Sequence, residues 1–147
     1  MEPVTLQNKV IQGIQVRTNN ANEANPDSAK IGQLWQSFCA TDYFKNRGDA
    51  PVYGVYHDFE SDDKGDYSLL TGVEVEAGNG KDAQVTLASG NYLVFRAEGK
   101  MPDVVFETWA KIWAYFDSTE ATHKRAYQTD FEYYLNDQGV DIYISVE

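Results

Sequence analysis

The sequence has little of the chemistry that most metal sites need. Its only cysteine is Cys39, and its two histidines are His57 and His123. A single cysteine excludes an intramolecular disulfide and a cysteine-based metal site. The histidines lack the His-x-x-x-His spacing of a typical metal pair, so we predict no metal. We interpret Cys39, which follows a predicted helix, as a small core residue.

Sequence motifs for catalysis and cofactor binding are also missing. There is no Gly-x-Ser-x-Gly elbow and no signature of a catalytic triad. The glycine-rich segment 78–81 lacks the spacing and the Ser/Thr of a phosphate-binding loop. We therefore predict no catalytic residue, no cofactor and no enzyme activity.

Long apolar runs and positive charge are scarce as well. The N-terminal residues form neither the basic nor the apolar region of a signal peptide, and no run approaches about 18 apolar residues. We expect a cytoplasmic protein with no membrane segment. The 12 Lys and Arg residues face 23 Asp and Glu residues, which gives a net charge of −11. Because phosphate contacts dominate nucleic-acid affinity, this charge predicts no direct nucleic-acid binding.

What the sequence has in quantity is aromatic side chains. Three Trp, 10 Tyr and 7 Phe make up 14% of the 147 residues, and the hydrophobic set reaches 42%. A disordered acidic chain lacks such residues, so this composition predicts a folded protein. The length predicts one domain, residues 1–147.

The hydrophobic pattern predicts the order strand, helix, strand, strand, repeated once. The predicted strands are 4–17, with an irregularity at Gly13, then 52–59, 67–76, 83–97, 127–135 and 140–146. One helix follows Pro26 with the apolar stripe Ile31, Leu34, Trp35 and Phe38. The other is capped by Asp103 and has the stripe Phe106, Trp109, Ile112, Trp113 and Phe116.

Local matches between the two halves support a duplication. Val4-Thr5-Leu6 recurs as Val85-Thr86-Leu87, and Leu34-Trp35 recurs as Ile112-Trp113 at a similar offset. The predicted fold class is α+β, a duplicated β-α-β-β unit with an antiparallel sheet and two helices. Its pseudo-repeats span about 1–77 and 81–147, fused into one domain because neither half is large enough for a comfortable core.

One carboxylate has an unusual sequence environment. Alternation in strand 127–135 places Asp130, Glu132 and Tyr134 on one face and Phe131, Tyr133 and Leu135 on the other. Glutamate is depleted in strands, so Glu132 either faces water or is held inside a cavity. Inside a cavity its pKa rises unless a cation pairs with it. A buried carboxylate among aromatic rings is suited to binding an organic cation.

The other candidate groups have plainer interpretations. The acidic segment 58–66 does not follow the calcium-loop pattern, and a solvated hairpin explains it better. Glu107 lies four residues before Lys111 and fits a surface pair. Trp109 and Trp113 belong to a stripe that is usually core, although Trp109 also suits a pocket wall.

Several segments together resemble the GyrI-like effector-binding domains, which are attached to many AraC-type and MerR-type transcription regulators. In the first half they are Tyr53-Gly54-Val55-Tyr56, Gly65-Asp66-Tyr67 and Thr71-Gly72-Val73-Glu74-Val75. In the second half they are residues 88–95, Gly99, residues 109–113 (WAKIW) and residues 130–134 (DFEYY). The resemblance covers nearly the whole chain. It extends to stand-alone members of the family that are carried on integron cassettes and bind cationic drugs.

The resemblance implies a ligand pocket between the halves. Glu132 corresponds to the acidic pocket residue and Trp109 to the helix tryptophan, while Tyr53 or Tyr56 represents the first-half aromatics. The full predicted ligand-binding set is Glu132, Trp109, Tyr56, Tyr53, Trp113, Tyr134 and Tyr92. The chain has no room for the helix-turn-helix domain of the regulators, so a DNA-binding regulator would have to be a separate protein partner.

Three functions follow from this resemblance. The first is binding of amphipathic or aromatic organic cations, with a role in transcription regulation or drug sensing. The second is hydrolysis of cyclopropane-containing compounds, as in some GyrI-like proteins, with Glu132 as general acid or base. The third is masking of a target such as gyrase, with the acidic hairpin 58–66 docking on a basic surface.

Overall fold

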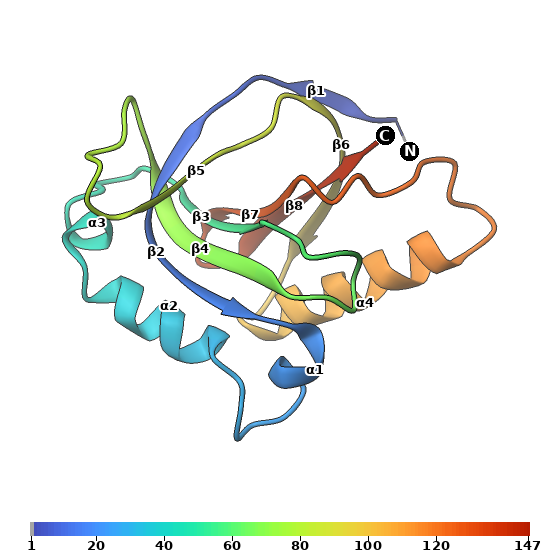
Figure 1. The fold of residues 1–147 in the computed structure, drawn as a ribbon, viewed down its shortest axis with the longest axis horizontal. Coiled ribbons are helices and arrows are strands. Elements are labelled where there is room, and N and C mark those ends of the chain that lie inside the picture. Colours follow the sequence, from blue (N-terminus) through green and yellow to red (C-terminus); the bar gives the residue numbers. More distant parts are fainter. Residues whose placement is uncertain (1) are drawn as a thin grey trace.

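The computed structural model describes residues 2–147, which form an eight-stranded antiparallel sheet and four helices (Figure 1). The strands are β1 (Val4–Leu6), β2 (Val10–Thr18), β3 (Val52–His57), β4 (Tyr67–Val75), β5 (Ala83–Thr86), β6 (Gly90–Glu98), β7 (Thr129–Asn136) and β8 (Gly139–Val146). The helices are α1 (Asn20–Glu23), α2 (Ile31–Cys39), α3 (Asp42–Lys45) and α4 (Asp103–Asp117). The predicted α+β class is confirmed.

The strand order is symmetric about the middle of the sheet. It runs β1-β6-β8-β7-β3-β4-β2-β5, so that β7 and β3 form the central pair and each half repeats the same sequence of strands outward. The edge strands are exchanged: β1 pairs with β6 of the second half, and β5 pairs with β2 of the first half. A duplicated β-α-β-β unit produces this order.

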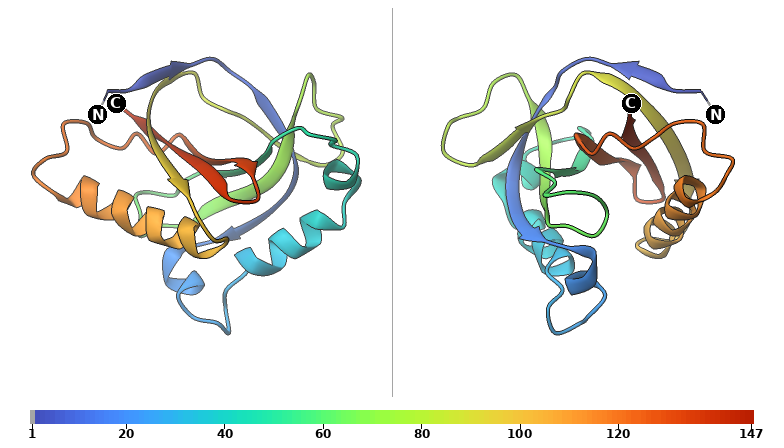
Figure 2. Two further views of the ribbon diagram at one scale, coloured as in Figure 1. Left: turned by 180° about the vertical axis from the view of Figure 1, so that it is seen from behind. Right: turned by 45° about the vertical axis from the view of Figure 1, so that its right-hand side comes forward.

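The sheet curls strongly, and its two faces pack against different partners (Figure 2). The inside of the curl holds a core that includes Ile11, Tyr53, Leu70 and Phe131. The outer face carries Leu69 and Ile142, which pack with α2 and α4, respectively. Both faces of the sheet therefore carry packed side chains, and alternation along a strand assigns side chains to different environments.

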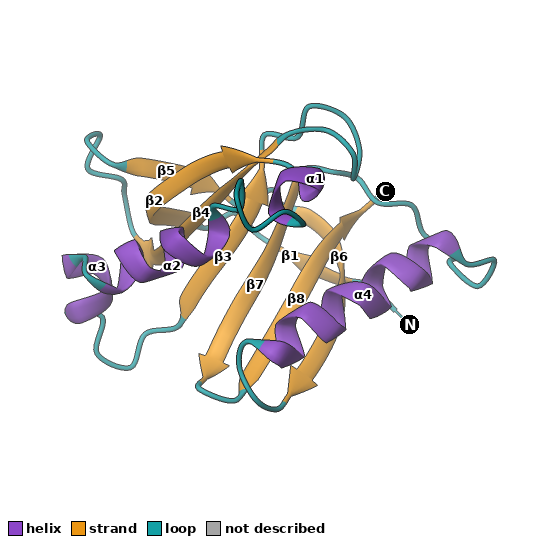
Figure 3. Cartoon of the chain, turned by 90° about the horizontal axis from the view of Figure 1, so that it is seen from below, coloured by secondary structure: helices purple, strands orange, loops and turns teal. Residues whose placement is uncertain are grey.

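The two longer helices leave the middle of the outer face open. Helix α2 packs on β2 and β4 through Leu34, and α4 packs along β6 and β8 through Val105 and Ile112. Figure 3 shows the two helices on either side of β3 and β7. The central strands thus become the floor between two helical walls. Within residues 2–147, no helix is long and apolar enough to cross a membrane.

Two predicted strands are each divided in the structure. The predicted strand 4–17 is interrupted at residues 7–9, while Gly13 lies inside β2 and pairs with Gly72. A Cβ at Gly13 would lie only 1.9 Å from the Thr71 carbonyl oxygen, so glycine allows this close approach. The predicted strand 83–97 divides at residues 87–89 because β5 pairs with β2, whereas β6 pairs with β1 and β8.

Four residues of the predicted helices are placed differently. Cys39, the last residue of α2, is exposed rather than in the core, because Leu34 and Phe38 form the buried side of this helix. Phe106 and Trp113 are 67% and 41% exposed, since the sheet-facing stripe of α4 runs instead through Val105 and Ile112. Asp103 is the first residue of α4, and Pro102 takes the cap position before it.

Candidate ligand-binding cleft

A cleft of about 1220 Å³ lies over the central strands, between α2 and α4. Its floor includes Tyr56 from β3 and Glu132 and Tyr134 from β7, while Trp35 from α2 and Trp109 from α4 line its sides. These residues come together because β3 and β7 pair directly and the helices stand apart on the outer face. The symmetric fold therefore builds this cleft at the junction of its two halves.

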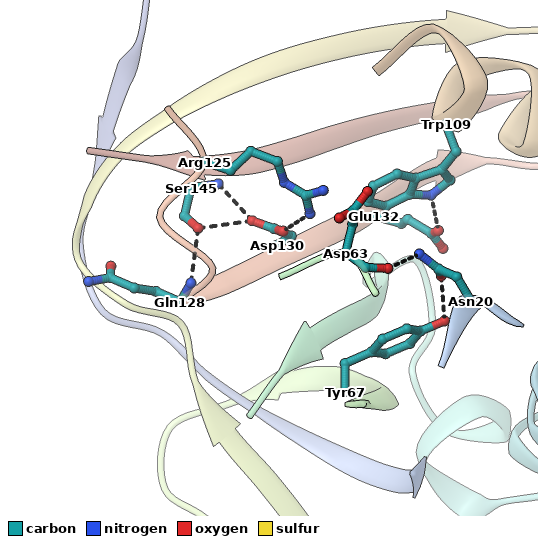
Figure 4. Close-up of polar contacts among 9 residues, drawn as sticks. All are labelled: Asn20, Asp63, Tyr67, Trp109, Arg125, Gln128, Asp130, Glu132 and Ser145. Carbon is teal, nitrogen blue, oxygen red and sulfur yellow. Dashed lines mark hydrogen bonds and ion pairs between the residues drawn. The ribbon is translucent and has the colours of Figure 1, made fainter. Parts of the chain in front are cut away.

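Glu132 is the charged group at the centre of this floor. Its side chain is buried, with 2% of the residue exposed. Oε2 accepts hydrogen bonds from Trp109 Nε1 at 2.7 Å and from the Tyr56 hydroxyl at 2.9 Å, and Oε1 accepts one from the Tyr134 hydroxyl at 2.7 Å. Figure 4 shows the indole N–H of Trp109 directed at the carboxylate. All three partners are aromatic donors without a formal charge.

Burial and hydrogen bonding act on the pKa of Glu132 in opposite directions. Loss of solvent raises the pKa, while the bonds from Tyr134, Trp109 and Tyr56 lower it; the burial effect is larger, and the pKa lies above its ordinary value. Burial and the neighbouring carboxylate also raise the pKa values of Tyr56 and Tyr134, which stay protonated donors. The carboxylate is thus hydrogen-bonded, but in the described part of the chain no basic side chain pairs with it.

Gly54 provides the space that this arrangement needs. It lies directly opposite Glu132 in the β3–β7 pair. A Cβ at this position would be 3.0 Å from Trp35 Cζ2 and 3.1 Å from Glu132 Oε1, closer than nearly all real contacts. Its lack of a side chain lets the Trp35 ring and the Glu132 carboxylate approach the same point on the floor.

Asp130, two residues before Glu132, is held differently. Its carboxylate is fully buried and accepts a 2.7 Å bond from Arg125 Nη2. It also accepts bonds from the backbone N–H of Ser145 at 2.8 Å and from the Ser145 hydroxyl at 2.9 Å (Figure 4). Burial raises the pKa of Asp130, while Arg125 and the Ser145 bonds oppose that shift.

The cleft as a whole is lined by more negative than positive groups. Its basic residues are Arg47 and Arg125, and its acidic residues are Glu23, Asp49, Asp62, Asp63, Glu132 and Asp137. Both arginines already have partners, because Arg47 donates to the Phe44 carbonyl at 2.7 Å and Arg125 pairs with Asp130. Within residues 2–147, no group of His, Cys, Asp and Glu side chains is arranged to hold a metal ion.

The structure brings together five of the seven residues predicted for ligand binding. Those that line the cleft are Glu132, Trp109, Tyr56, Trp113 and Tyr134. Tyr53 and Tyr92 lie instead in the core inside the curl, on the opposite face of the sheet. Tyr53 is three residues from Tyr56 on one strand, so alternation sends the two rings to opposite faces. The Tyr92 hydroxyl is used internally, donating to the Ala88 carbonyl at 2.6 Å.

Sequence reasoning missed five aromatic residues of the cleft: Trp35, Phe44, Phe59, Tyr67 and Phe106. Trp35 meets the Tyr134 ring edge-on with centroids 5.3 Å apart, and Tyr67 meets Tyr56 at 5.4 Å. Phe59, after β3, packs against Tyr67 at 6.3 Å. The repeat contained a signal for Trp35, since it aligned this residue with Trp113 on the opposite wall. Nothing in the local pattern distinguished Tyr67 from a core residue.

Comparison with known proteins relates this geometry to a family. Residues 4–146 match the family described as "Integron-associated effector binding protein". An integron cassette protein from the mobile metagenome of Vibrio cholerae has the same fold, with a TM-score of 0.89, 36% identity, and coverage of 99% of this chain and 94% of that one.

Two more distant proteins also match, one by its structure and one by its sequence. The protein SAV2435, whose structure contains tetraphenylphosphonium, matches with a TM-score of 0.77 and 22% identity over all of this chain and 94% of its own. YobU of Bacillus subtilis (strain 168), named as a proposed transcriptional regulator, is 26% identical over 95% of this chain and 92% of its own length. The matches to this family and to the cassette protein span nearly the whole chain. The protein therefore belongs to the family of integron-associated effector binding proteins.

Proposed function

We propose that this protein binds a hydrophobic organic cation in the cleft between α2 and α4, next to Glu132. The observation that carries the proposal is a buried carboxylate whose hydrogen-bond partners are two phenols and an indole. A buried charge is costly unless an opposite charge accompanies it. A cation entering the cleft would supply that charge.

The surroundings of Glu132 favour an organic cation over a metal ion. The rings of Trp35, Tyr56 and Trp109 line the cleft around the carboxylate. Aromatic faces attract cations by about 0.5–2 kcal/mol each and also give dispersion contacts, which suits a ligand whose charge is surrounded by apolar groups. The net charge of −11 adds a long-range attraction for cations.

The comparisons support the same ligand class. The family is one of effector-binding proteins, and SAV2435, which shares the fold, has been crystallised with the lipophilic cation tetraphenylphosphonium. The relation to YobU supports a role in which ligand binding is read out in transcription regulation. Because the cleft is lined by neither histidine nor cysteine, the competing hydrolase function would depend on Glu132 and its tyrosines.

Calorimetric titration with tetraphenylphosphonium tests the proposal. We expect Glu132→Gln, which keeps the shape of the side chain but removes its charge, to weaken binding at least about tenfold, or about 1.4 kcal/mol. Glu107→Gln is the matched control, because Glu107 is an exposed acid of α4 that does not line the cleft. It should bind as wild type does.

Two results would contradict this function. One is equal affinity of wild type and Glu132→Gln for tetraphenylphosphonium. The other is equally tight binding of triphenylphosphine oxide, a neutral compound with similar rings, since the carboxylate would then contribute nothing. Turnover of cyclopropane-containing compounds by wild type, lost in Glu132→Gln, would instead identify a hydrolase.

A further inference from the structure

Most of the exposed large hydrophobic residues gather at the cleft. Among residues 2–147 there are four, and three of them, Phe106, Trp113 and Leu135, line the cleft with 67%, 41% and 52% of their surface exposed. The fourth, Val4, lies on β1 outside it. Isolated exposed apolar residues are ordinary, whereas a group beside a cavity indicates a contact surface. We name Phe106, Trp113 and Leu135 the apolar rim.

On α4 the apolar rim lies next to Trp109, which lines the side of the cleft. Phe106, Trp109 and Trp113 are spaced at i, i+3 and i+7, which places them along one face of the helix. The rings of Trp109 and Trp113 lie 6.1 Å apart, centroid to centroid. Because Trp109 also donates to Glu132, its ring links the Glu132 carboxylate to the partly exposed ring of Trp113.

On β7, Leu135 lies at the edge of the cleft. Alternation places it opposite Tyr134, on the face of Phe131 and Tyr133, where it borders a small hollow with Arg96 and Asp141. The pairing of β7 with β8 shifts register between Tyr134 and Asn136, and both Tyr134 and Leu135 line the cleft. Bulges of this kind are common beside binding sites. Leu135 therefore extends the apolar rim around the end of the strand.

We infer that the ligands of this site are amphiphilic cations with an extended apolar tail, which lies along the apolar rim while the charged head lies beside Glu132. This rests on the proposed function. The cleft volume of about 1220 Å³ exceeds the about 300–1,000 Å³ typical of drug-sized sites, which leaves room beyond a compact head. The continuity of the rim with the cleft favours a ligand tail over a protein partner, which would close the route to Glu132.

A homologous series of N-alkylpyridinium salts tests this inference. We would measure dissociation constants by calorimetry for butyl to dodecyl chains, each below its micelle concentration. In wild type, affinity should rise by up to about fourfold per methylene while the tail finds apolar surface, and then level off. Phe106→Gln with Trp113→Gln should flatten this dependence, so that the loss of affinity relative to wild type grows with each added methylene.

Val4→Gln provides the matched control, since it removes an exposed apolar side chain outside the cleft. It should keep the wild-type chain-length dependence. A dependence that is absent in wild type, or that Val4→Gln flattens as much as the rim variant does, would overturn the inference. So would a dimer that the rim variant dissociates, measured by light scattering, because a second copy would then cover the rim. If Glu132→Gln still weakens tetraphenylphosphonium binding in these cases, the proposed function stands and only the inference about the tail is overturned. If wild type binds no cation at all, the proposed function itself is overturned.

Discussion

Asp130 and Glu132 make an internal comparison, because they lie two residues apart on one face of β7 and both are buried. Asp130 has a cation of its own, Arg125, at 2.7 Å. Within residues 2–147, no basic side chain lies within salt-bridge distance of Glu132. The same strand thus holds one carboxylate that is neutralised by the fold and one that is not.

The difference separates structure from function on a single strand. Asp130 bonds to Ser145 of β8 and to Arg125 in the segment before β7, so its partners hold neighbouring parts of the chain together. The partners of Glu132 are side chains of the cleft, and they provide hydrogen bonds without charge. A buried charge left without a counter-ion costs stability, and such costs are typical of binding sites.

Removing the positive charge of Arg125, which pairs with Asp130, should have the largest effect on stability. Arg125→Met leaves Asp130 buried and unpaired, so we expect a loss of about 3–5 kcal/mol in unfolding free energy. Urea denaturation measures it. Adding Asp130→Asn to this variant should recover much of the loss, because the uncompensated charge is then gone.

Lys9→Met is the control for this prediction. Lys9 pairs with Glu74 at 3.8 Å, and the two side chains are 47% and 50% exposed; exposed pairs contribute about 0–1 kcal/mol. If Arg125→Met cost no more than Lys9→Met, Arg125 would not be what compensates Asp130. The contrast between Asp130 and Glu132 would then lose its basis.

Filling the space opposite Glu132 should have a smaller effect on stability and a clear one on binding. In Gly54→Ala, the new methyl group would lie 3.0 Å from the Trp35 ring and 3.1 Å from the Glu132 carboxylate, which is closer than nearly all real contacts. Overpacking of this kind costs about 1–3 kcal/mol, and the displaced carboxylate should weaken tetraphenylphosphonium binding. Calorimetry and urea denaturation on the same variant measure both effects.

The control for Gly54→Ala is a glycine with free space around it. A Cβ at Gly32 in α2 would have nothing within 4 Å, so Gly32→Ala should stabilise the protein by about 0.4–1 kcal/mol. Wild-type binding and stability in Gly54→Ala would show that the close approach at Gly54 is not needed.

The comparison also shows what the sequence could predict about this site. Alternation placed Asp130, Glu132 and Tyr134 on one face, and the structure agrees. The pattern left open whether Glu132 was buried or faced water, because both faces of β7 carry aromatic residues. That Arg125 compensates Asp130 but not Glu132 depends on the path of residues 118–128, which no local pattern describes.

The remaining differences have a similar cause. Tyr92 and Tyr53 were assigned to the site by resemblance, yet the curl of the sheet encloses them on the other face. The curl arises from pairings between distant strands, such as β1 with β6, that local periodicity does not encode. Trp35 enters the cleft from α2 for the same reason, since only the assembled sheet positions that helix opposite α4.

The smallest effect should be on the pH dependence of stability, where the sign follows from burial. The native pKa of Glu132 is raised, so the native state holds its proton more tightly than the unfolded state does. Stability is therefore lost as the pH rises from the ordinary glutamate value of 4.5 through the native pKa. Glutamine does not ionise, so we expect ligand-free Glu132→Gln to gain stability relative to wild type across this window.

Urea denaturation of both proteins at several pH values measures this gain as a difference, which cancels the contribution of Asp130. Any change in hydrogen bonding from the amide shifts the difference by a constant, so its slope with pH is the quantity to examine. Saturating tetraphenylphosphonium should reduce or reverse the slope, because a bound cation favours the ionised carboxylate and lowers its pKa. A difference that does not change with pH, with or without the cation, would mean that the native pKa of Glu132 is not raised and that its hydrogen bonds already compensate its charge in the ligand-free protein.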